Sequence, residues 1–247
     1  MKSQLKIQLG ILLLAVGYFL SRLVNPTTLN WSIWQRVYFG NFIKDTGILA
    51  LSLLLIYYIF NNIRRNPQIG PTIISAVKIK QVLIFGIILS WLAAINHMIF
   101  DSLKIIFPFH HLPLYQFANF LDETISHIFM FLPTIIFISL ITFFEIQRPE
   151  QQKVSNKETW LIIINSIILG IFWGFNLSEG RLSLYTAFPL MIFYFLFFMF
   201  LNKKYQLSLK NLPFSLFGLI GSVSGSISFI VYNLIFKSST ELFSLFV

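Results

Sequence analysis

Long apolar runs separated by short polar segments fill most of this chain of 247 residues. A helix needs about 20 mostly apolar residues to cross the hydrocarbon core of a bilayer. Seven runs meet this requirement, and we expect transmembrane helices at approximately residues 7–24, 46–62, 80–100, 122–144, 159–178, 184–202 and 212–236. No internal repeat or long linker interrupts them. The pattern therefore predicts an all-α, polytopic integral membrane protein whose residues 1–247 form one domain of seven transmembrane helices.

Two regions near the N-terminus need a separate interpretation. The run at 7–24 follows Lys2 and Lys6, an order typical of a signal peptide, but no small-residue cleavage site comes after it. We therefore expect an uncleaved first helix. The segment 27–44 is too polar to span, and its Trp31, Trp34 and Tyr38 are typical of a piece that lies at the membrane interface.

Composition supports the membrane class and narrows the chemistry. The chain is 56% hydrophobic and only 11% charged, whereas soluble domains carry roughly 25% charged residues. Cysteine is absent, which excludes disulfides, thiolate metal ligands and cysteine nucleophiles.

The distribution of lysine and arginine predicts the orientation, because these residues are in excess in cytoplasmic loops. With the N-terminus inside, 6 of the 18 cationic residues fall outside, namely Arg22, Arg36, Lys44, Lys104, Arg181 and Lys237, and the other 12 fall inside. We therefore predict a cytoplasmic N-terminus and an outer C-terminus in the cell (inner) membrane. The net charge of +9 does not indicate a nucleic-acid partner, because the cations flank apolar runs.

Titratable residues gather on the outer side of this predicted topology. The four histidines lie at the outer ends of the third and fourth predicted helices or between them, namely His97, His110, His111 and His127. Three acids fall in the same zone, namely Asp101, Asp122 and Glu123. Ionisable groups at membrane depth are costly and therefore indicate function.

The spacing of these residues points to a metal. His97 and Asp101 are four residues apart, as are Glu123 and His127, which places each pair on one face of an α-helix. Two such helices could hold Zn²⁺, which takes tetrahedral nitrogen and oxygen ligands. The candidate ligands are His97, Asp101, His111 and His127. Asp122 or Glu123 would then act as the general base toward a metal-bound water.

Simpler explanations exist for the same residues. Asp122 and Glu123 could occupy the first turn of the fourth helix, with Asn119 as its cap, where acids suit the helix dipole. His127 could form an interhelical hydrogen bond with Asn96 or His97.

Two further features fall outside this cluster. Glu179 and Arg181 lie in the predicted outer turn between the fifth and sixth helices. They could bind an anionic headgroup of a substrate, or simply pair across a tight turn at Gly180. In the last run, "GLIGSVSGSIS" offers small residues that let helices approach closely, and we expect packing against the first or sixth helix.

The stretch "HLPLYQFANFLDE", residues 111–123, resembles a segment of the alkaline ceramidases, in which a histidine precedes an Asp-Glu pair by the same spacing. Those proteins belong to a set of seven-helix membrane hydrolases that share a zinc site. The resemblance implies His111 as a zinc ligand and Asp122 as a catalytic carboxylate. Phe107 stands at the position of the family's serine, and the last predicted helix lacks an H-x-x-x-H pattern.

These observations favour a metal-dependent hydrolase of a lipid, or of a lipid-linked amide or ester, with Zn²⁺ as its cofactor and a site open to the outer leaflet. The alternative is a transporter, channel or small-molecule sensor whose outer vestibule uses the same residues.

Overall fold

The computed structural model describes residues 6–7, 9–13, 16, 32–34, 37–38, 49–69, 74–106, 112–179, 187–205 and 208–236. Within these ranges, some side chains are not described, including those of Asp101, Glu123, His127 and Glu179. The structural features below belong to the described residues.

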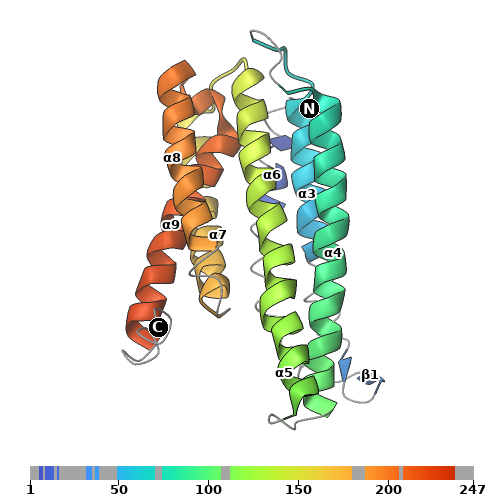
Figure 1. Cartoon of the computed structure of the whole chain (residues 1–247). Coiled ribbons are helices and arrows are strands. Elements are labelled where there is room, and N and C mark those ends of the chain that lie inside the picture. Colours follow the sequence, from blue (N-terminus) through green and yellow to red (C-terminus); the bar gives the residue numbers. More distant parts are fainter. Residues whose placement is uncertain are drawn as a thin grey trace.

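Helices make up nearly all of the described structure (Figure 1). Residues 6–7, 9–13 and 16 are helical, within the first predicted run. The α-helices that follow are α3 (Leu49–Ile63), α4 (Ala76–Ile106), α5 (Pro113–Phe120), α6 (His127–Gln147), α7 (Asn156–Glu179), α8 (Ala187–Tyr205) and α9 (Pro213–Phe236). A π-helix, η2 (Leu121–Ser126), joins α5 to α6, and a 3₁₀ turn, η3 (Leu209–Asn211), precedes α9. Strands β1 (Ser32–Trp34) and β2 (Val37–Tyr38) pair antiparallel within the segment that we expected at the interface.

The helical part of the predicted fold class is confirmed. Three of the described helices contain a stretch long and apolar enough to cross a membrane, at Ala76–Phe100, Asn156–Gly174 and Pro213–Ile235. Shorter apolar stretches lie in α3 and α6, at Leu51–Ile63 and Leu132–Gln147. The chain is therefore a helical protein in which three described helices are long and apolar enough to span a membrane.

Two helices differ in extent from the predicted spans. The third predicted helix, 80–100, is the 31-residue α4, which continues past its polar end to Ile106. The fourth, 122–144, is the end of a continuous helical rod that begins at Pro113 and runs through α5, η2 and α6. Hydropathy marks only the apolar middle of such helices, whereas backbone hydrogen bonding continues through their polar ends.

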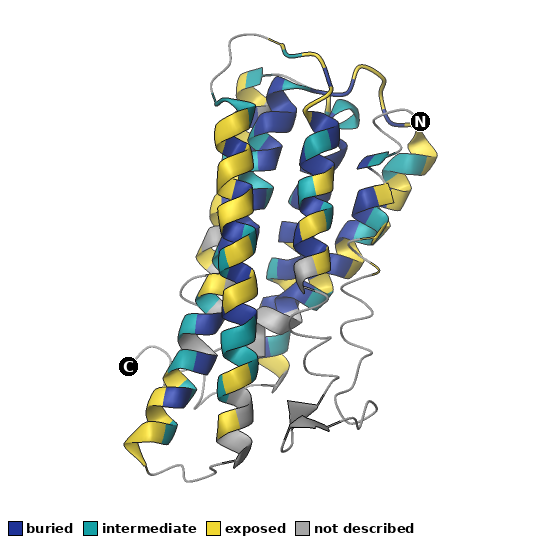
Figure 2. Cartoon of the chain, turned by 90° about the vertical axis from the view of Figure 1, so that its right-hand side faces the viewer, coloured by how far each residue is buried: buried dark blue, intermediate teal, exposed yellow. Residues whose placement is uncertain are grey.

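The helices form two groups of three. α4 contacts α3 and α6 on one side of the molecule, while α9 contacts α7 and α8 on the other (Figure 1). α6 also contacts α8 and α9, so it joins the groups. The buried core crosses the same boundary, because Phe60 of α3, Phe137 of α6 and Phe217 of α9 belong to one cluster. Buried positions face inward and exposed ones outward (Figure 2).

The closest helix pair is α7 with α9. A methyl group at Gly170 would overlap the side chain of Ser224, and one at Gly174 would come within 2.8 Å of Cβ of Ser228. Ser228 Oγ also donates a 3.0 Å hydrogen bond to the carbonyl of Ile171 across the pair. The small residues of the last run therefore serve tight packing, as predicted. The prediction of the partner is confirmed in part: Gly218 packs against Tyr194 of α8, the sixth predicted helix, but the tightest partner is α7, the fifth predicted helix, which has matching small residues of its own.

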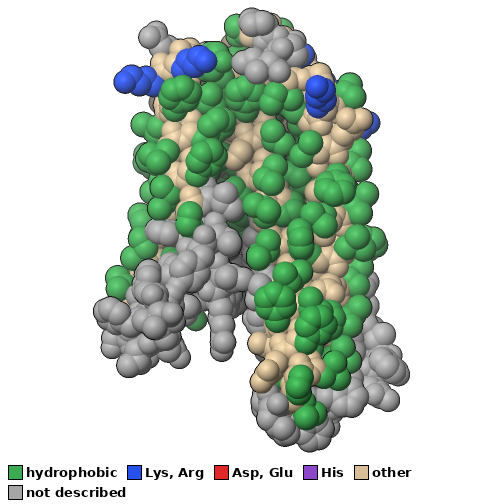
Figure 3. Space-filling view, viewed as in Figure 1, with side chains coloured by type: hydrophobic (Ala, Val, Ile, Leu, Met, Phe, Trp, Pro, Cys, Tyr) green, Lys and Arg blue, Asp and Glu red, His purple; other side chains and the backbone are tan. Residues whose placement is uncertain are grey.

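The described lysine and arginine side chains lie at one end of the bundle (Figure 3). They lie at Lys6 near the N-terminus, at the ends of α3, α6 and α8, and at the starts of α4, α7 and α9. Alternating helix directions thus bring cations from seven places in the sequence together. We call this the cationic end.

Candidate functional site

The π-helix η2 faces α4, and two polar pairs join them. His97 Nδ1 of α4 contacts Asp122 Oδ1 of η2, in a very short hydrogen bond. One residue earlier on α4, Asn96 Nδ2 donates a 2.7 Å hydrogen bond to Ser126 Oγ. Ser126 Oγ in turn donates to the carbonyl of Leu121, five residues back, at 2.8 Å. Adjacent residues of one helix therefore bind opposite ends of the same π-helical stretch.

The π-helix has a physical role in this arrangement. A π-turn closes hydrogen bonds to the fifth residue instead of the fourth, and such turns occur frequently at functional sites. The extra residue rotates α5 relative to α6, which changes the directions in which the side chains of η2 point. Asp122 and Ser126, four residues apart, can thereby contact neighbouring residues of α4.

Burial differs between the two partners of the central pair. The Asp122 side chain is 0% exposed, whereas that of His97 is 19% exposed. Water or a small substrate can therefore approach the imidazole but not the carboxylate. Asp122 thus fixes the orientation of His97. An ionised carboxylate only accepts hydrogen bonds, so beside ionised Asp122 a neutral ring would hold its proton on Nδ1 and its lone pair on Nε2.

The helix-capping explanation for Asp122 and Glu123 is wrong. The helical rod that contains them starts at Pro113, with Leu112 at the cap position. Asp122 therefore lies about nine residues, or about 14 Å, inside the rod, where the positive charge of a helix N-terminus has faded. Asn119 is likewise an interior residue of α5 and not a cap. The buried acid has its histidine partner in place of the helix dipole.

The predicted same-face relation of Glu123 and His127 rested on α-helical geometry. Glu123 lies in the π-helix, and His127 is the first residue of α6, so a spacing of four does not place them as it would on an α-helix. The expected interhelical hydrogen bond at this depth exists, but Ser126 provides the acceptor for Asn96. The side chain of His127 lies outside the described residues.

The other candidate site residues divide as follows. Of the four predicted zinc ligands, only His97 has a described side chain, while His111 and the side chains of Asp101 and His127 fall outside the description. Arg181 and the side chain of Glu179 fall outside it as well. Among the described side chains, no group of three or more histidines and acids is close enough to hold a metal.

Sequence reasoning missed a second buried acid, at the cationic end. Glu145 is completely buried in α6, and its carboxylate accepts hydrogen bonds from the backbone N–H groups of Phe214 and Ser215, at 2.9 and 2.7 Å. The hydroxyl of Ser215 donates a third, at 2.6 Å. The signal in the sequence is a helix that starts at Pro213 after Leu212, which cannot cap it. Such a start needs an acceptor from elsewhere in the fold.

A polar network close to Glu145 links three segments at the cationic end. Arg148 donates to the carbonyl of Asn66 at 2.7 Å and to Gln68 Oε1 at 2.9 Å. Asn66 donates to Glu150 Oε1, and Asn211 donates to the carbonyl of Glu150 at 2.6 Å. The geometry of this network is that of a structural clamp.

Comparison with protein-family models, with curated proteins and with solved structures finds no match to this chain.

Proposed function

We propose that this chain is a multi-pass membrane hydrolase that cleaves an amide or ester bond of a lipid, with His97 as the central catalytic residue. The observation that carries the proposal is the contact between a partly exposed His97 and a fully buried Asp122. A histidine oriented by a carboxylate is the arrangement by which hydrolytic sites position a base. Asp122 is then a positioning residue instead of the base that the sequence pattern suggested.

The chemistry follows from the tautomer that an ionised Asp122 would impose. Nε2 of His97 accepts a proton from water as the water attacks the carbonyl carbon of the substrate. The imidazolium that forms is stabilised by the buried carboxylate beside Nδ1. His97 then returns the proton to the leaving amine or alcohol.

The depth of the pair supports a lipid substrate. His97 lies 17 residues after Lys80 on the same helix, or about 25 Å along it at the α-helical rise. The hydrocarbon core of a bilayer is about 30 Å thick. If Lys80 marks the cytoplasmic interface, His97 lies near the opposite interface, at the depth of the carbonyl groups of the outer leaflet. The seven spans and the inside position of the N-terminus are part of this proposal.

Zinc belongs to the proposal through the same histidine. A carboxylate that accepts from one ring nitrogen orients the other nitrogen toward a metal in many zinc sites. In a zinc-bound form, Nε2 of His97 would be one ligand and no longer the base, the predicted ligands Asp101, His111 and His127 would supply the others, and Glu123 would take the role of general base. When bound, zinc would activate the attacking water. Arg181 and Glu179 are proposed to contact the headgroup of the substrate.

Reconstituted protein tests the proposal directly. Vesicles that contain an N-acylated lipid or a diacyl phospholipid are incubated with the protein, and released fatty acid is measured by mass spectrometry. We expect His97→Ala and Asp122→Asn each to lower the rate by about 100-fold or more, while Glu158→Gln, at the far end of the bundle, keeps it. Bound zinc, measured by elemental analysis, should fall in His97→Ala. Absence of release by the unchanged protein, or release that survives both substitutions, would refute the proposal.

A transporter is the second candidate, and one observation favours it. The rod formed by α5, η2 and α6 departs from a regular α-helix at the π-helix and contains Pro133, which lacks a backbone N–H, inside α6. Interrupted helices form the ion and substrate sites of many transporters. Proton flux across the same vesicles, with no fatty acid released, would assign the pair of His97 and Asp122 to proton transfer instead of hydrolysis.

A further inference from the structure

The cationic end carries exposed positive charge that the described acids do not neutralise. Arg64, Arg65, Lys78, Lys80, Lys203 and Lys204 are all exposed. Among the described residues, the acids at this end are engaged elsewhere: Glu145 caps α9, and Glu150 binds Asn66. Glu158 accepts hydrogen bonds from the backbone and hydroxyl of Ser155, at 2.8 and 2.7 Å. The fold thus uses its acids internally and leaves the cations on the surface.

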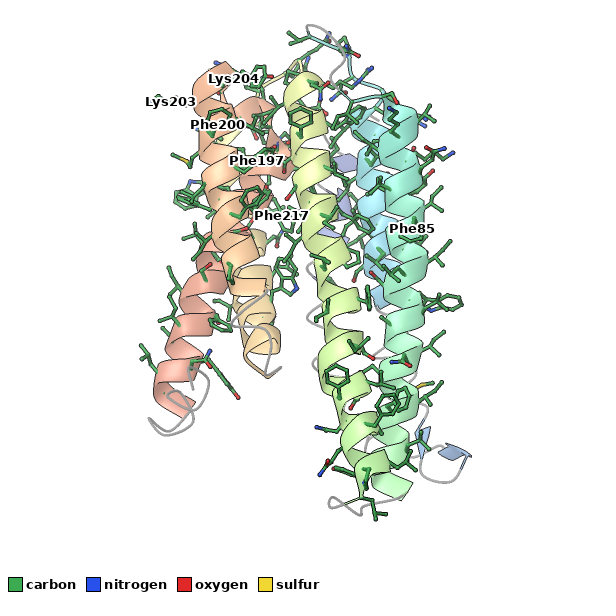
Figure 4. The ribbon with its side chains drawn as sticks, in the orientation of Figure 1. Phe85, Phe197, Phe200, Lys203, Lys204 and Phe217 are labelled. Atoms are coloured by element: carbon green, nitrogen blue, oxygen red, sulfur yellow. The ribbon has the colours of Figure 1, made fainter. Side chains whose placement is uncertain are left out.

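On α8, Lys203 and Lys204 lie at the end of a stripe of exposed apolar side chains. Phe193, Leu196 and Phe200 are 60%, 58% and 62% exposed, and they are spaced three and four residues apart. This spacing defines one face of a helix, and the next positions on that face are Lys203 and Lys204. Figure 4 shows Phe200 one turn below the two lysines at the end of α8. The Lys204 ammonium lies 5.5 Å from the centre of the Tyr205 ring, which holds it at this level.

The start of α4 repeats the arrangement on the other side of the bundle. Lys78 and Lys80 are exposed in its first turns, and Phe85, 67% exposed, lies on the apolar surface that follows (Figure 4). The polar-to-apolar boundary therefore falls at the same end on both sides. An apolar face capped by cations matches the shape of a phospholipid, whose phosphate lies above its acyl chains.

We propose that the ends of α8 and α4 bind anionic phospholipids, with the headgroup phosphates at Lys203 and Lys204 and at Lys78 and Lys80. The acyl chains lie along Phe193, Leu196 and Phe200 on α8 and along Phe85 on α4. The uninterrupted apolar stripe beneath the lysines favours a lipid over a nucleic acid, whose backbone would require cations along the whole surface. This inference does not depend on the proposed hydrolase activity.

Lipid binding is measured by native mass spectrometry on protein released from nanodiscs that contain equal amounts of phosphatidylglycerol and phosphatidylcholine. We expect the unchanged protein to retain phosphatidylglycerol preferentially. The variants K203Q/K204Q and K78Q/K80Q should each weaken that preference, by about fivefold for each lysine removed. The variant K203R/K204R keeps the charge and should keep the preference.

Three results would overturn the inference. The first is an unchanged preference when all four lysines are glutamine. The second is a loss of preference in K203R/K204R equal to that in K203Q/K204Q, because charge would then not be the cause. The third is binding of a single-stranded oligonucleotide that phosphatidylglycerol does not displace. Since all four lysines are exposed, the thermal unfolding temperature of each variant in detergent should match that of the unchanged protein.

Discussion

The carboxylate of Glu145 accepts three hydrogen bonds from the first turn of α9, a helix that begins 68 residues later in the chain. The side chain acts as an N-cap supplied by a different helix. Free N–H groups at a helix start have to be satisfied when they are buried. In return, the N–H groups and the positive end of the helix dipole stabilise a carboxylate that water does not reach. Each partner offsets part of the cost of burying the other.

Replacement of Glu145 by alanine is therefore expected to destabilise the protein. The change leaves the N–H groups of Phe214 and Ser215 buried without an acceptor, which should cost about 2 kcal/mol. Glu158→Ala is the matched control, since Glu158 also lies at a helix start but is only half-buried, and it should cost under about 1 kcal/mol. Unfolding in a denaturing detergent, followed by tryptophan fluorescence, measures both. Equal losses would contradict the cap assigned to Glu145.

At the scale of the elements, two features determine where helices meet. The π-helix η2 directs Asp122 toward His97, and the glycines of α7 admit the backbone of α9. The first feature is a change in backbone hydrogen bonding, and the second is the absence of side chains at the contact. In each case, polar or backbone atoms from two helices can come together in an apolar environment.

The α7–α9 contact predicts that alanine at two glycine positions changes the stability of the protein to different extents. Gly174→Ala inserts a methyl group into the backbone of Gly225 and Phe229, and we expect it to destabilise the protein by about 2–3 kcal/mol. Gly221→Ala, on the facing helix, meets only the carbonyl of Ser166 at 3.7 Å and should be tolerated. Thermal unfolding in detergent compares the two. A tolerated Gly174→Ala would mean that the helices are farther apart than the structure has them.

At the scale of the whole molecule, charge separates the two ends. The described lysine and arginine side chains occupy one end (Figure 3). The pair of His97 and Asp122 lies toward the other end, because His97 is 17 residues after Lys80 on α4. The positive-inside rule would place the cationic end in the cytoplasm and the His97 pair on the outer side. The absence of cysteine makes this orientation simple to test.

Single cysteines introduced at the two ends report the orientation. Lys157, exposed at the start of α7, and Leu114, 71% exposed in α5, lie at opposite ends. We expect a membrane-impermeant maleimide to label Leu114→Cys in intact cells, and Lys157→Cys only after the cells are permeabilised. Labelling in the reverse pattern would invert the orientation and move the proposed site to the cytoplasmic side.

The sequence by itself determined the class of protein and the residues worth examining. Whether a run is apolar and long enough to span a membrane depends only on neighbouring residues, so the helices could be predicted from the local sequence. The small-residue face of α9 could be predicted in the same way. His97 and Asp122 stood out because titratable groups are rare in such a chain. Residues 27–44 were predicted as a segment too polar to span, but the antiparallel pairing of Ser32 with Tyr38 within it was not predicted.

Only the tertiary structure decided the partners. Asp122 pairs with a histidine 25 residues away, Glu145 caps a helix that begins 68 residues later, and α9 packs on α7. Such contacts depend on the rotation and depth of each helix, and a single π-turn changes both for everything that precedes it. Hydropathy does not record that turn, because the composition of residues 121–126 suits an α-helix equally well. The local sequence thus determines where helices form, while the way in which whole helices pack determines which polar groups come into contact.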